Sequence, residues 1–451
     1  MSRLSVSEVV TPDNVAKEVV NNLPNDISAK NKFLDIASKT GEFANALLNK
    51  YGEKIKNNIY SVPTSGVTYE CTRKIYKLLG MPEEHIYSDF TSYDLIDTSK
   101  NKKILKELKE MNFDAIMGNP PYQVMDGGAQ ASARPIYNEF VEEAQNIKPN
   151  YISIIMPTRW YAGGKGLDEF RDKMLNDIHI KELHDYTHPE LLFPETNNRG
   201  GICFFVWDEN YDNTKLLTRV VTYSAKGISS DIRRPIKIEG ADIFIRNNEA
   251  ISIIKKVFEK NPESFENHVS SRKPFGLDTT FVKSAAFKDS ADGLKEPVVC
   301  YGKNWCIGYI EKELIISHKE WVGEWKLFAP YANNIGTELN DDNLNTVVGG
   351  PNTICTESYL LLGINLNLNE ISANNLSKYT KTKFLRALHS LAKVSQHATA
   401  KTYRFVPLQD FTSNSDIDWS KSVSEIDKQL YKKYNLSAEE ISFIESKVRE
   451  M

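Results

Sequence analysis

The first half of the chain alternates short apolar segments with amphipathic ones, and this alternation restricts the fold more than any other feature. Apolar segments typical of buried β-strands lie at residues 32–36, 59–62, 86–90, 113–118, 151–157, 179–186 and 201–207. Helical periodicity covers residues 12–20, 42–48, 69–79, 136–147 and 167–175. Strands that alternate with helices predict an α/β fold with a mostly parallel sheet covered on both faces.

Acidic and polar residues follow several of the predicted strands. Asp35 lies at the end of the first strand and Gly41 in the turn after it, Asp89 ends the third and Asn119 follows the fourth. In parallel sheets, ligands bind beyond the carboxyl ends of the strands. We therefore expect these four residues to gather at one site.

The spacing of the cysteines and the lengths of the apolar segments limit which metal sites, disulfides and cellular compartments are expected. The cysteines are scattered, with no C-x-x-C pair and no histidines at metal-ligand spacing, which predicts a reducing compartment without a zinc site or a disulfide frame. No apolar run approaches the roughly 18 residues that a membrane span needs, and the start at Met1 shows no signal-peptide pattern. We expect a cytoplasmic protein with no metal and no membrane partner.

The tetrapeptide Asn119-Pro120-Pro121-Tyr122 carries the clearest chemical signal. An exocyclic amine such as adenine N6 is a poor nucleophile, because its lone pair is delocalised into the ring. The side-chain oxygen of Asn119 and the carbonyl of Pro120 could accept both N–H groups and localise that pair, and consecutive prolines stiffen the loop. Tyr122 offers a ring on which a base flipped out of a duplex could stack. We predict that these four residues are catalytic and act mainly by positioning.

The turn after the first strand is typical of a cofactor loop. It runs from Asp35 through Ala37 to Gly41 and would let a cofactor lie against the backbone, with Phe43 packing on an adenine ring. A glycine-containing turn from strand to helix is also common in any α/β protein. Asp89 is either a strand-end cap or an acceptor for the amino group of the cofactor adenine.

In this order, the motifs resemble those of the amino DNA methyltransferases, and more specifically the gamma-class adenine-N6 methylases of type II restriction-modification systems. The resemblance covers roughly residues 8 to 210 and implies a Rossmann-like methyltransferase domain that binds S-adenosylmethionine. It places Thr11 and Pro12 at the methionine moiety, and Asp89 and Phe90 at the cofactor adenine.

The resemblance also assigns the pocket for the target base. Residues 154–160 and 163–166 are similar to the family's next strand and loop, which line that pocket. Phe204 is the expected second aromatic against the base, with Phe205 as the neighbouring candidate. The Asn119–Tyr122 segment takes the place of the catalytic loop.

The chain departs from the family pattern at two positions in the cofactor motifs. Lys39 takes the place of a glycine in the first loop and brings a cation near the expected cofactor carboxylate. The second strand lacks the usual acid for the ribose hydroxyls: residues 63–65 are Pro-Thr-Ser, and the nearest downstream acid is Glu70.

The second half of the chain is aromatic-rich and irregular, as in a domain that reads bases in a groove. We predict a methyltransferase domain at residues 1–212, a mixed α+β target-recognition domain at 213–410 and a helical appendage at 411–451, which includes the capping-box pattern at 437–440.

One segment of the second half, residues 371–409, contains no Asp or Glu. Within it, the apolar residues Phe384, Leu385, Leu388, Leu391 and Val394 are spaced like the buried stripe of a helix. The basic residues are expected to lie largely off that stripe, either as an ordinary solvated helix face or as contacts to DNA phosphates; the candidates for phosphate contacts are Lys381, Lys383, Arg386 and Lys393.

Together these features predict a site-specific DNA adenine-N6 methyltransferase of a restriction-modification or phage-defence system. Double-stranded DNA is the expected partner, and a separate restriction subunit is left open. The two altered cofactor motifs keep a catalytically silent DNA-binding subunit as an alternative. Glutamine-N5 protein methyltransferases and guanine-N2 RNA methyltransferases share the tetrapeptide but usually have little chain after it.

Overall fold

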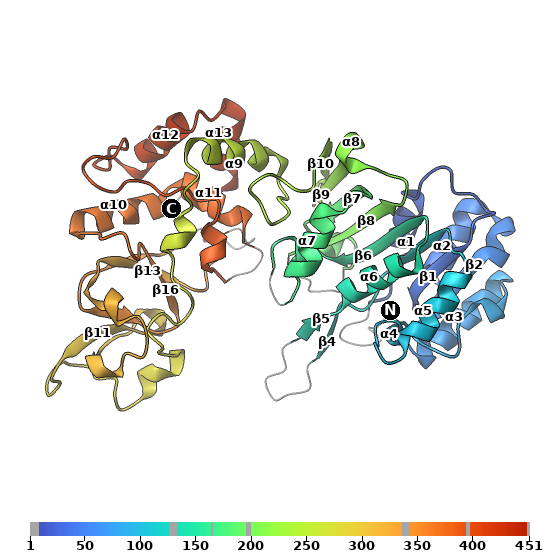
Figure 1. Ribbon diagram of the computed structural model, residues 1–451, viewed down its shortest axis with the longest axis horizontal. Helices are drawn as coiled ribbons and strands as arrows, with labels where there is room; N and C mark the ends of the chain where they lie inside the picture. Colours follow the sequence, from blue (N-terminus) through green and yellow to red (C-terminus); the bar gives the residue numbers. More distant parts are fainter. Residues whose placement is uncertain are drawn as a thin grey trace. The chain divides into compact units, whose positions relative to one another are not determined.

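The computed structural model describes residues 9–125, 133–163, 166–194, 200–335, 343–393 and 397–448. The chain divides into two compact units, Met1–Phe244 and Ile245–Met451 (Figure 1). Gly164 and Lys165 of the expected pocket loop, and Val394 of the expected apolar stripe, lie outside the described residues.

The first unit is built on an eight-stranded sheet with the order β10-β9-β7-β8-β6-β3-β1-β2. Its strands are β1 (Phe33–Ser38), β2 (Ile59–Pro63), β3 (Ala115–Gly118), β6 (Tyr151–Pro157), β7 (Ile180–Tyr186), β8 (Ile202–Asp208), β9 (Thr218–Ser224) and β10 (Gly227–Arg234). The pairs β1–β2, β1–β3, β3–β6 and β7–β9 are parallel, and β6–β8, β7–β8 and β9–β10 are antiparallel. The predicted α/β class with a mostly parallel sheet is confirmed.

Helices pack against this sheet: α2 (Glu42–Tyr51) and α3 (Gly66–Leu79) contact β1, and α6 (Tyr137–Ile147) contacts β6. All six residues of β1 are buried, and because successive side chains of a strand point to opposite faces, neither face of β1 meets solvent. The other helices of the unit are α1 (Asp13–Asn21), α4 (Ser92–Leu95), α5 (Asn101–Glu110), α7 (Asp168–Asn176) and α8 (Asn213–Leu216). A small sheet of β4 (Gln123–Met125) and β5 (Ala133–Pro135) follows the Asn-Pro-Pro-Tyr segment.

One local prediction in this unit was wrong, and helix α5 was not predicted. Residues 86–90 form no strand: Ile86 makes an isolated parallel bridge to Ser61, because a 3₁₀ turn at Glu83–His85 precedes it and a capping box at Thr91 soon starts α4. Helix α5 was not expected, because its lysine-rich sequence buries only Ile104 and Leu108 among its apolar residues.

The second unit combines small sheets with helices, as the predicted mixed α+β composition requires. One sheet contains β11 (Pro297–Tyr301), β12 (Ile307–Glu311) and β15 (Thr353–Cys355), and another contains β13 (Lys326–Pro330), β14 (Val347–Gly349) and β16 (Tyr359–Leu362). The helices are α9 (Asn248–Lys260), α10 (Glu370–Lys381), α11 (Lys383–Leu391), α12 (Val423–Lys433) and α13 (Ala438–Lys447). The capping box before the last helix is confirmed, since the Ser437 side chain accepts the N–H of Glu440.

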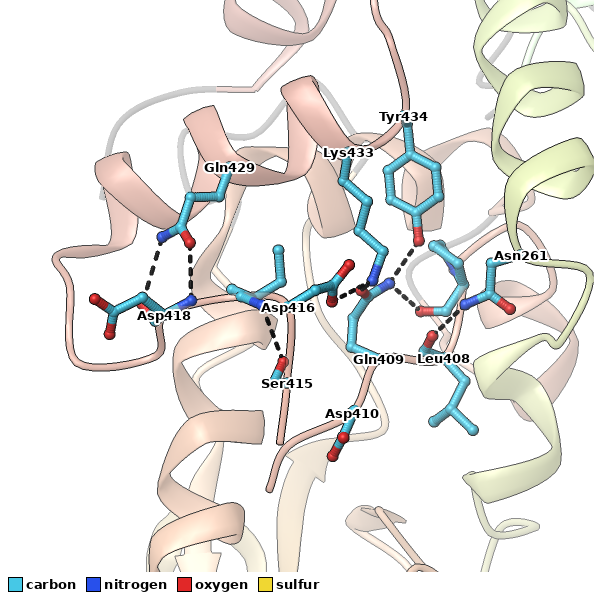
Figure 2. A network of polar contacts seen from close by, with 12 residues as sticks. Asn261, Leu408, Gln409, Asp410, Ser415, Asp416, Asp418, Gln429, Lys433 and Tyr434 are labelled. Carbon is cyan, nitrogen blue, oxygen red and sulfur yellow. Dashed lines mark hydrogen bonds and ion pairs between the residues drawn. The ribbon is translucent and has the colours of Figure 1, made fainter. Parts of the chain in front are cut away.

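A polar network holds the segment before α12 against that helix (Figure 2). Gln409 lies at its centre: its Nε2 donates to Tyr434 Oη at 2.8 Å, and its Oε1 accepts from Lys433 Nζ at 2.9 Å. The same lysine contacts Asp416 at 2.8 Å, and Asn261 Nδ2 donates to the carbonyl of Leu408. These contacts join residues after 410 to the rest of the second unit. In the first unit, β9 and β10 extend the sheet beyond residue 212. The domain boundaries at residues 212 and 410 therefore stay predictions.

Candidate active site

The carboxyl ends of β1 and β3 lie side by side, at the place where the strand order reverses. Asp35 of β1 is paired in register with Met117 of β3, so the residues that follow the two strands are neighbours. The approach is close: a Cβ on Gly118 would lie 2.9 Å from Cγ2 of Ile36. This is the position in an open α/β sheet at which ligands bind.

The side chain of Asn119 is held so that its oxygen is left without a partner. Its Nδ2 donates to the carbonyl of Val9 at 3.2 Å and to Thr11 Oγ1 at 3.3 Å. A carbonyl can only accept, so the nitrogen of the amide must face Val9. The residue is 1 % exposed, and its Oδ1 is buried with no hydrogen-bond partner among the described residues. A buried unpaired acceptor is costly, and here it is available to a donor on a ligand.

Asp35 provides a second unpaired acceptor nearby. Its Oδ1 accepts the N–H of Ala37 at 3.1 Å, whereas its Oδ2 is buried and has no hydrogen-bond partner within the described part of the chain. Burial, with a further contribution from the Glu42 carboxylate, raises the pKa of Asp35 to about 7. The carboxyl group therefore titrates near neutrality.

Glu42, at the start of α2, organises the loop after β1 and was not identified from the sequence. Its Oε2 accepts the N–H groups of Thr40 (2.9 Å) and Lys39 (3.3 Å), and its Oε1 accepts the N–H of Thr11 at 3.2 Å. One carboxylate thus links the loop to the segment before α1. Gly41 is the N-cap of α2 at φ +71°, a conformation that favours glycine.

Lys39, the residue that replaces the family's glycine, is 1 % exposed. Its Nζ donates to the carbonyl of Asn119 at 2.6 Å and to that of Ala37 at 3.3 Å. The ammonium group therefore lies between the two loops that follow β1 and β3.

Ser92 was also missed, although the Thr91-x-x-Asp94 capping pattern around it is visible in the sequence. It is fully buried at the start of α4, and its hydroxyl donates to the carbonyl of Ile36 at 2.9 Å. This contact links the start of α4 to β1.

The other expected cofactor residues are distributed around this centre. Thr11 is buried and belongs to it, and Pro12 is the N-cap of α1 rather than its first residue. Phe43 is 1 % exposed within the hydrophobic core, so its ring faces other side chains.

Phe90 is buried and packs on Tyr87 at 4.9 Å between ring centroids, whereas Asp89 is exposed and accepts from the Ser88 hydroxyl.

Tyr122 and Tyr137 come together after the catalytic segment. The backbone N–H of Ile136, next to Tyr137, donates to the Tyr122 carbonyl at 3.1 Å. Both hydroxyls are buried with no hydrogen-bond partner among the residues that the structure describes. Burial and the nearby Cys203 thiol raise the pKa of both tyrosines, so both hydroxyls stay protonated.

Phe204, the expected second aromatic against the target base, is 1 % exposed. Its ring stacks on that of His184, with 4.3 Å between centroids and 8° between planes. Because side chains alternate along β8, Phe204 points to the face opposite Cys203. One face of its ring is thus already occupied in this structure.

The basic residues of the second unit do not form the surface that was expected. Arg386 is 2 % exposed and Lys393 is 7 % exposed, so the prediction that both lie off the buried stripe was wrong. The reason is that α11 is packed on every side from Phe384 to His389, and protein carbonyls replace water: Lys393 Nζ donates to Asn333 at 2.6 Å and to Ile335 at 2.9 Å.

Two further basic candidates are placed differently. Lys383 is paired with Glu445 at 2.6 Å, an interaction that a phosphate would have to displace. Lys381 is half-buried in the last turn of α10. Of the four residues, Lys381 is therefore the one whose position agrees best with a phosphate contact.

Two features are absent from the residues that the structure describes. None of the described helices is both long and apolar enough to cross a membrane. Within the same described ranges, no three His, Cys, Asp or Glu side chains lie close enough together to hold a metal ion.

Comparison with known proteins identifies relatives of part of the chain. Residues 48–193 match the family of the Eco57I restriction-modification methylase. An uncharacterized adenine-specific methylase of Mycoplasma pneumoniae is 31 % identical over 155 residues, which are 33 % of this chain and 35 % of the relative. The chain thus spans about a third of the length of the curated relative that it matches. The resemblance to adenine-specific methylases of restriction-modification systems is confirmed over this segment.

Several solved structures align with this chain at low sequence identity. The type IIL restriction-modification enzyme MmeI in complex with DNA aligns with a TM-score of 0.49 and 11 % identity, over 96 % of this chain and 74 % of that one. The DrdV–DNA complex aligns with a TM-score of 0.49 and 12 % identity, over 89 % and 55 %. The M protein of the type I enzyme EcoKI aligns with a TM-score of 0.33 and 14 % identity, over 49 % and 48 %.

Proposed function

We propose that this chain is a DNA methyltransferase that moves a methyl group from S-adenosylmethionine to N6 of an adenine flipped out of double-stranded DNA, as part of a restriction-modification or phage-defence system. The observation that carries the proposal is the unpaired, buried Oδ1 of Asn119, whose amide is held by Val9 and Thr11. An acceptor fixed in this way suits a substrate that presents an N–H group.

The adenine amine would donate one hydrogen bond to Asn119 Oδ1 and the other to the carbonyl of Pro120. Two acceptors draw the lone pair of N6 out of conjugation with the ring, and this makes the nitrogen nucleophilic. The Asn119 acceptor is already held before the base arrives, so this group needs little reorganisation in the transition state. Tyr122 follows Pro121 in the sequence, and its ring would stack on the flipped base.

The residues at the end of β1 fit the proposed cofactor. S-adenosylmethionine supplies an electrophilic methyl group on its sulfonium. Asp35 offers the unpaired Oδ2 as an acceptor, and Thr11, Ala37 and Gly41 border the same loop. Asp89 is exposed and free of the core, so it can accept from an adenine amino group, with Phe90 beside it.

The Asn119→Ala variant tests this function. Genomic DNA from cells that express the wild-type chain should contain N6-methyladenine at one sequence, as read by methylation-sensitive sequencing. The variant should lose this mark by about a hundredfold or more while it still binds DNA. Full methylation by the variant would contradict the assignment of Asn119.

A second candidate is a catalytically silent DNA-binding subunit, which the buried Lys39 in the first cofactor loop favours. Calorimetry with S-adenosylhomocysteine, with and without DNA, separates the two. Binding of the cofactor product supports the enzyme, whereas no heat under either condition supports the silent subunit.

A further inference from the structure

Lys39 makes a contact that joins the two loops of the candidate active site. Its buried Nζ bridges the carbonyl of Ala37, near the carboxyl end of β1, and the carbonyl of Asn119, in the loop after β3. A buried ammonium group is costly unless acceptors surround it, and hydrogen bonds from a charged donor are stronger than neutral ones. The 2.6 Å contact to Asn119 is therefore a strong restraint on that carbonyl.

The carbonyl that Lys39 holds belongs to the peptide bond between Asn119 and Pro120. Because a peptide unit is planar, fixing this oxygen fixes the plane that contains the Cα atoms of both residues. The ring of Pro120 sets its φ, and Pro121 restricts its ψ to the extended region. The direction of the Pro120 carbonyl therefore follows from the orientation of the preceding peptide plane.

The same restraint acts on the second acceptor. The Asn119 side chain starts from a Cα that lies in the restrained plane, and its Nδ2 is held by Val9 and Thr11. The backbone N–H of Lys39 is itself bonded to Glu42, so the lysine is anchored at its base. A glycine at position 39 would keep this backbone N–H but would lack the ammonium contacts to the carbonyls of Ala37 and Asn119.

We propose that Lys39 is a positioning residue: its ammonium fixes the Asn119–Pro120 peptide plane, and thereby aims the Asn119 Oδ1 and the Pro120 carbonyl at the amine to be methylated. This inference rests on the proposed function, because the amine is the substrate group named there. The lysine that replaces a glycine of the cofactor motif then acts on the catalytic segment, Asn119–Tyr122.

The test compares Lys39→Met, which keeps the length but removes the donor, with Lys39→Arg, which keeps a cationic donor. Lys50→Met is the matched control, because Lys50 also donates to one backbone carbonyl, that of Val20 at 2.8 Å, away from the site. Lys39→Met should lower kcat by about 10- to 100-fold and leave the Kd for S-adenosylhomocysteine within about threefold, since only alignment is lost. Lys39→Arg should recover part of kcat, and Lys50→Met should match the wild type.

Two results would overturn the proposal. An unchanged kcat in Lys39→Met would show that the contact does not align the acceptors. Tighter binding of S-adenosylhomocysteine with an equal or higher kcat would show that Lys39 obstructs the cofactor instead. If Lys39→Met does not fold, the Lys39→Gly variant assayed with propylammonium replaces it: rescue of kcat by the cation but not by propanol supports the proposal, and no rescue contradicts it.

A readout that does not depend on methylation separates this proposal from the proposed function. Crystal structures of the wild type and of a folded variant, Lys39→Met or Lys39→Gly, should differ in the direction of the Asn119 carbonyl. If the wild type methylates no DNA, the proposed function fails, and an unchanged carbonyl in the variant would overturn the positioning role as well.

Discussion

Thr11 and Asn119 lie 108 positions apart in the sequence, and their side chains meet at 3.3 Å, Oγ1 to Nδ2. Together with the Val9 carbonyl, this contact decides which end of the Asn119 amide faces the site. The segment before α1 therefore has a role in the proposed chemistry besides bordering the cofactor.

The Thr11→Val variant should be slower than the wild type. Valine has nearly the same shape but no acceptor, so one hydrogen bond to the Asn119 amide is lost and the amide is less firmly oriented. A neutral hydrogen bond contributes about 1 kcal/mol, which corresponds to a decrease in kcat of about five- to tenfold. Initial rates of methyl transfer to DNA measure the effect, and Thr11→Ser is the control that should retain the rate. Equal rates for valine and serine would contradict this role.

Replacing Glu42 by alanine should destabilise the first unit. The backbone N–H groups of Thr11, Lys39 and Thr40 would lose their acceptor, at a cost of about 2–3 kcal/mol in the free energy of unfolding. Urea denaturation measures the change. Glu42→Gln, which keeps one oxygen, should cost less.

Glu53→Ala removes an exposed ion pair with Lys56 and should have little effect. A Glu42→Ala variant as stable as Glu53→Ala would show that the network does not support the fold.

Asp35 should make the stability of the protein depend on pH. Burial raises the pKa of its carboxyl from 3.8 to about 7 in the folded state, so between these values the folded state holds a proton that the unfolded state has released. The free energy of unfolding therefore falls as the pH rises from about 4 to about 7, and the contribution is constant above that range. Asp35→Asn keeps a neutral side chain that can accept from Ala37, and should lack this decline in denaturation curves recorded across the range. An identical pH dependence in both proteins would be evidence against the raised pKa.

Gly118→Ala should destabilise the protein and disturb the site. The new methyl group would lie 2.9 Å from Ile36 Cγ2, so the Ile36 side chain or the adjoining parts of β1 and β3 would have to shift, next to Asp35 and Asn119. Overpacking of this kind costs about 1–3 kcal/mol in the free energy of unfolding. Gly66→Ala, where no atom lies within 4 Å of the added Cβ, is the matched control and should be at least as stable as the wild type. Thermal melting of the two variants makes the comparison, and equal melting temperatures would refute the close-packing argument.

Much of the first unit follows from local sequence patterns. Six of the seven predicted segments became strands of the large sheet, because their apolar residues supply its buried faces. The exception at residues 86–90 lies between a 3₁₀ turn and a capped helix, which leave room only for an isolated bridge. The placement of Asp35 and Asn119 at the same edge of the sheet could also be predicted, since the carboxyl ends of parallel strands share one edge.

Only the tertiary structure decided how the side chains of the site are arranged and which charges are buried. The orientation of the Asn119 amide depends on Val9 and Thr11, and the position of the Lys39 ammonium depends on a carbonyl 80 residues away. Arg386 and Lys393 look like surface residues in the sequence, yet both are buried. The physical reason is the same in each case. Residue type and spacing determine which segments are strands or helices, whereas the partner of a buried polar group is chosen by how distant segments pack.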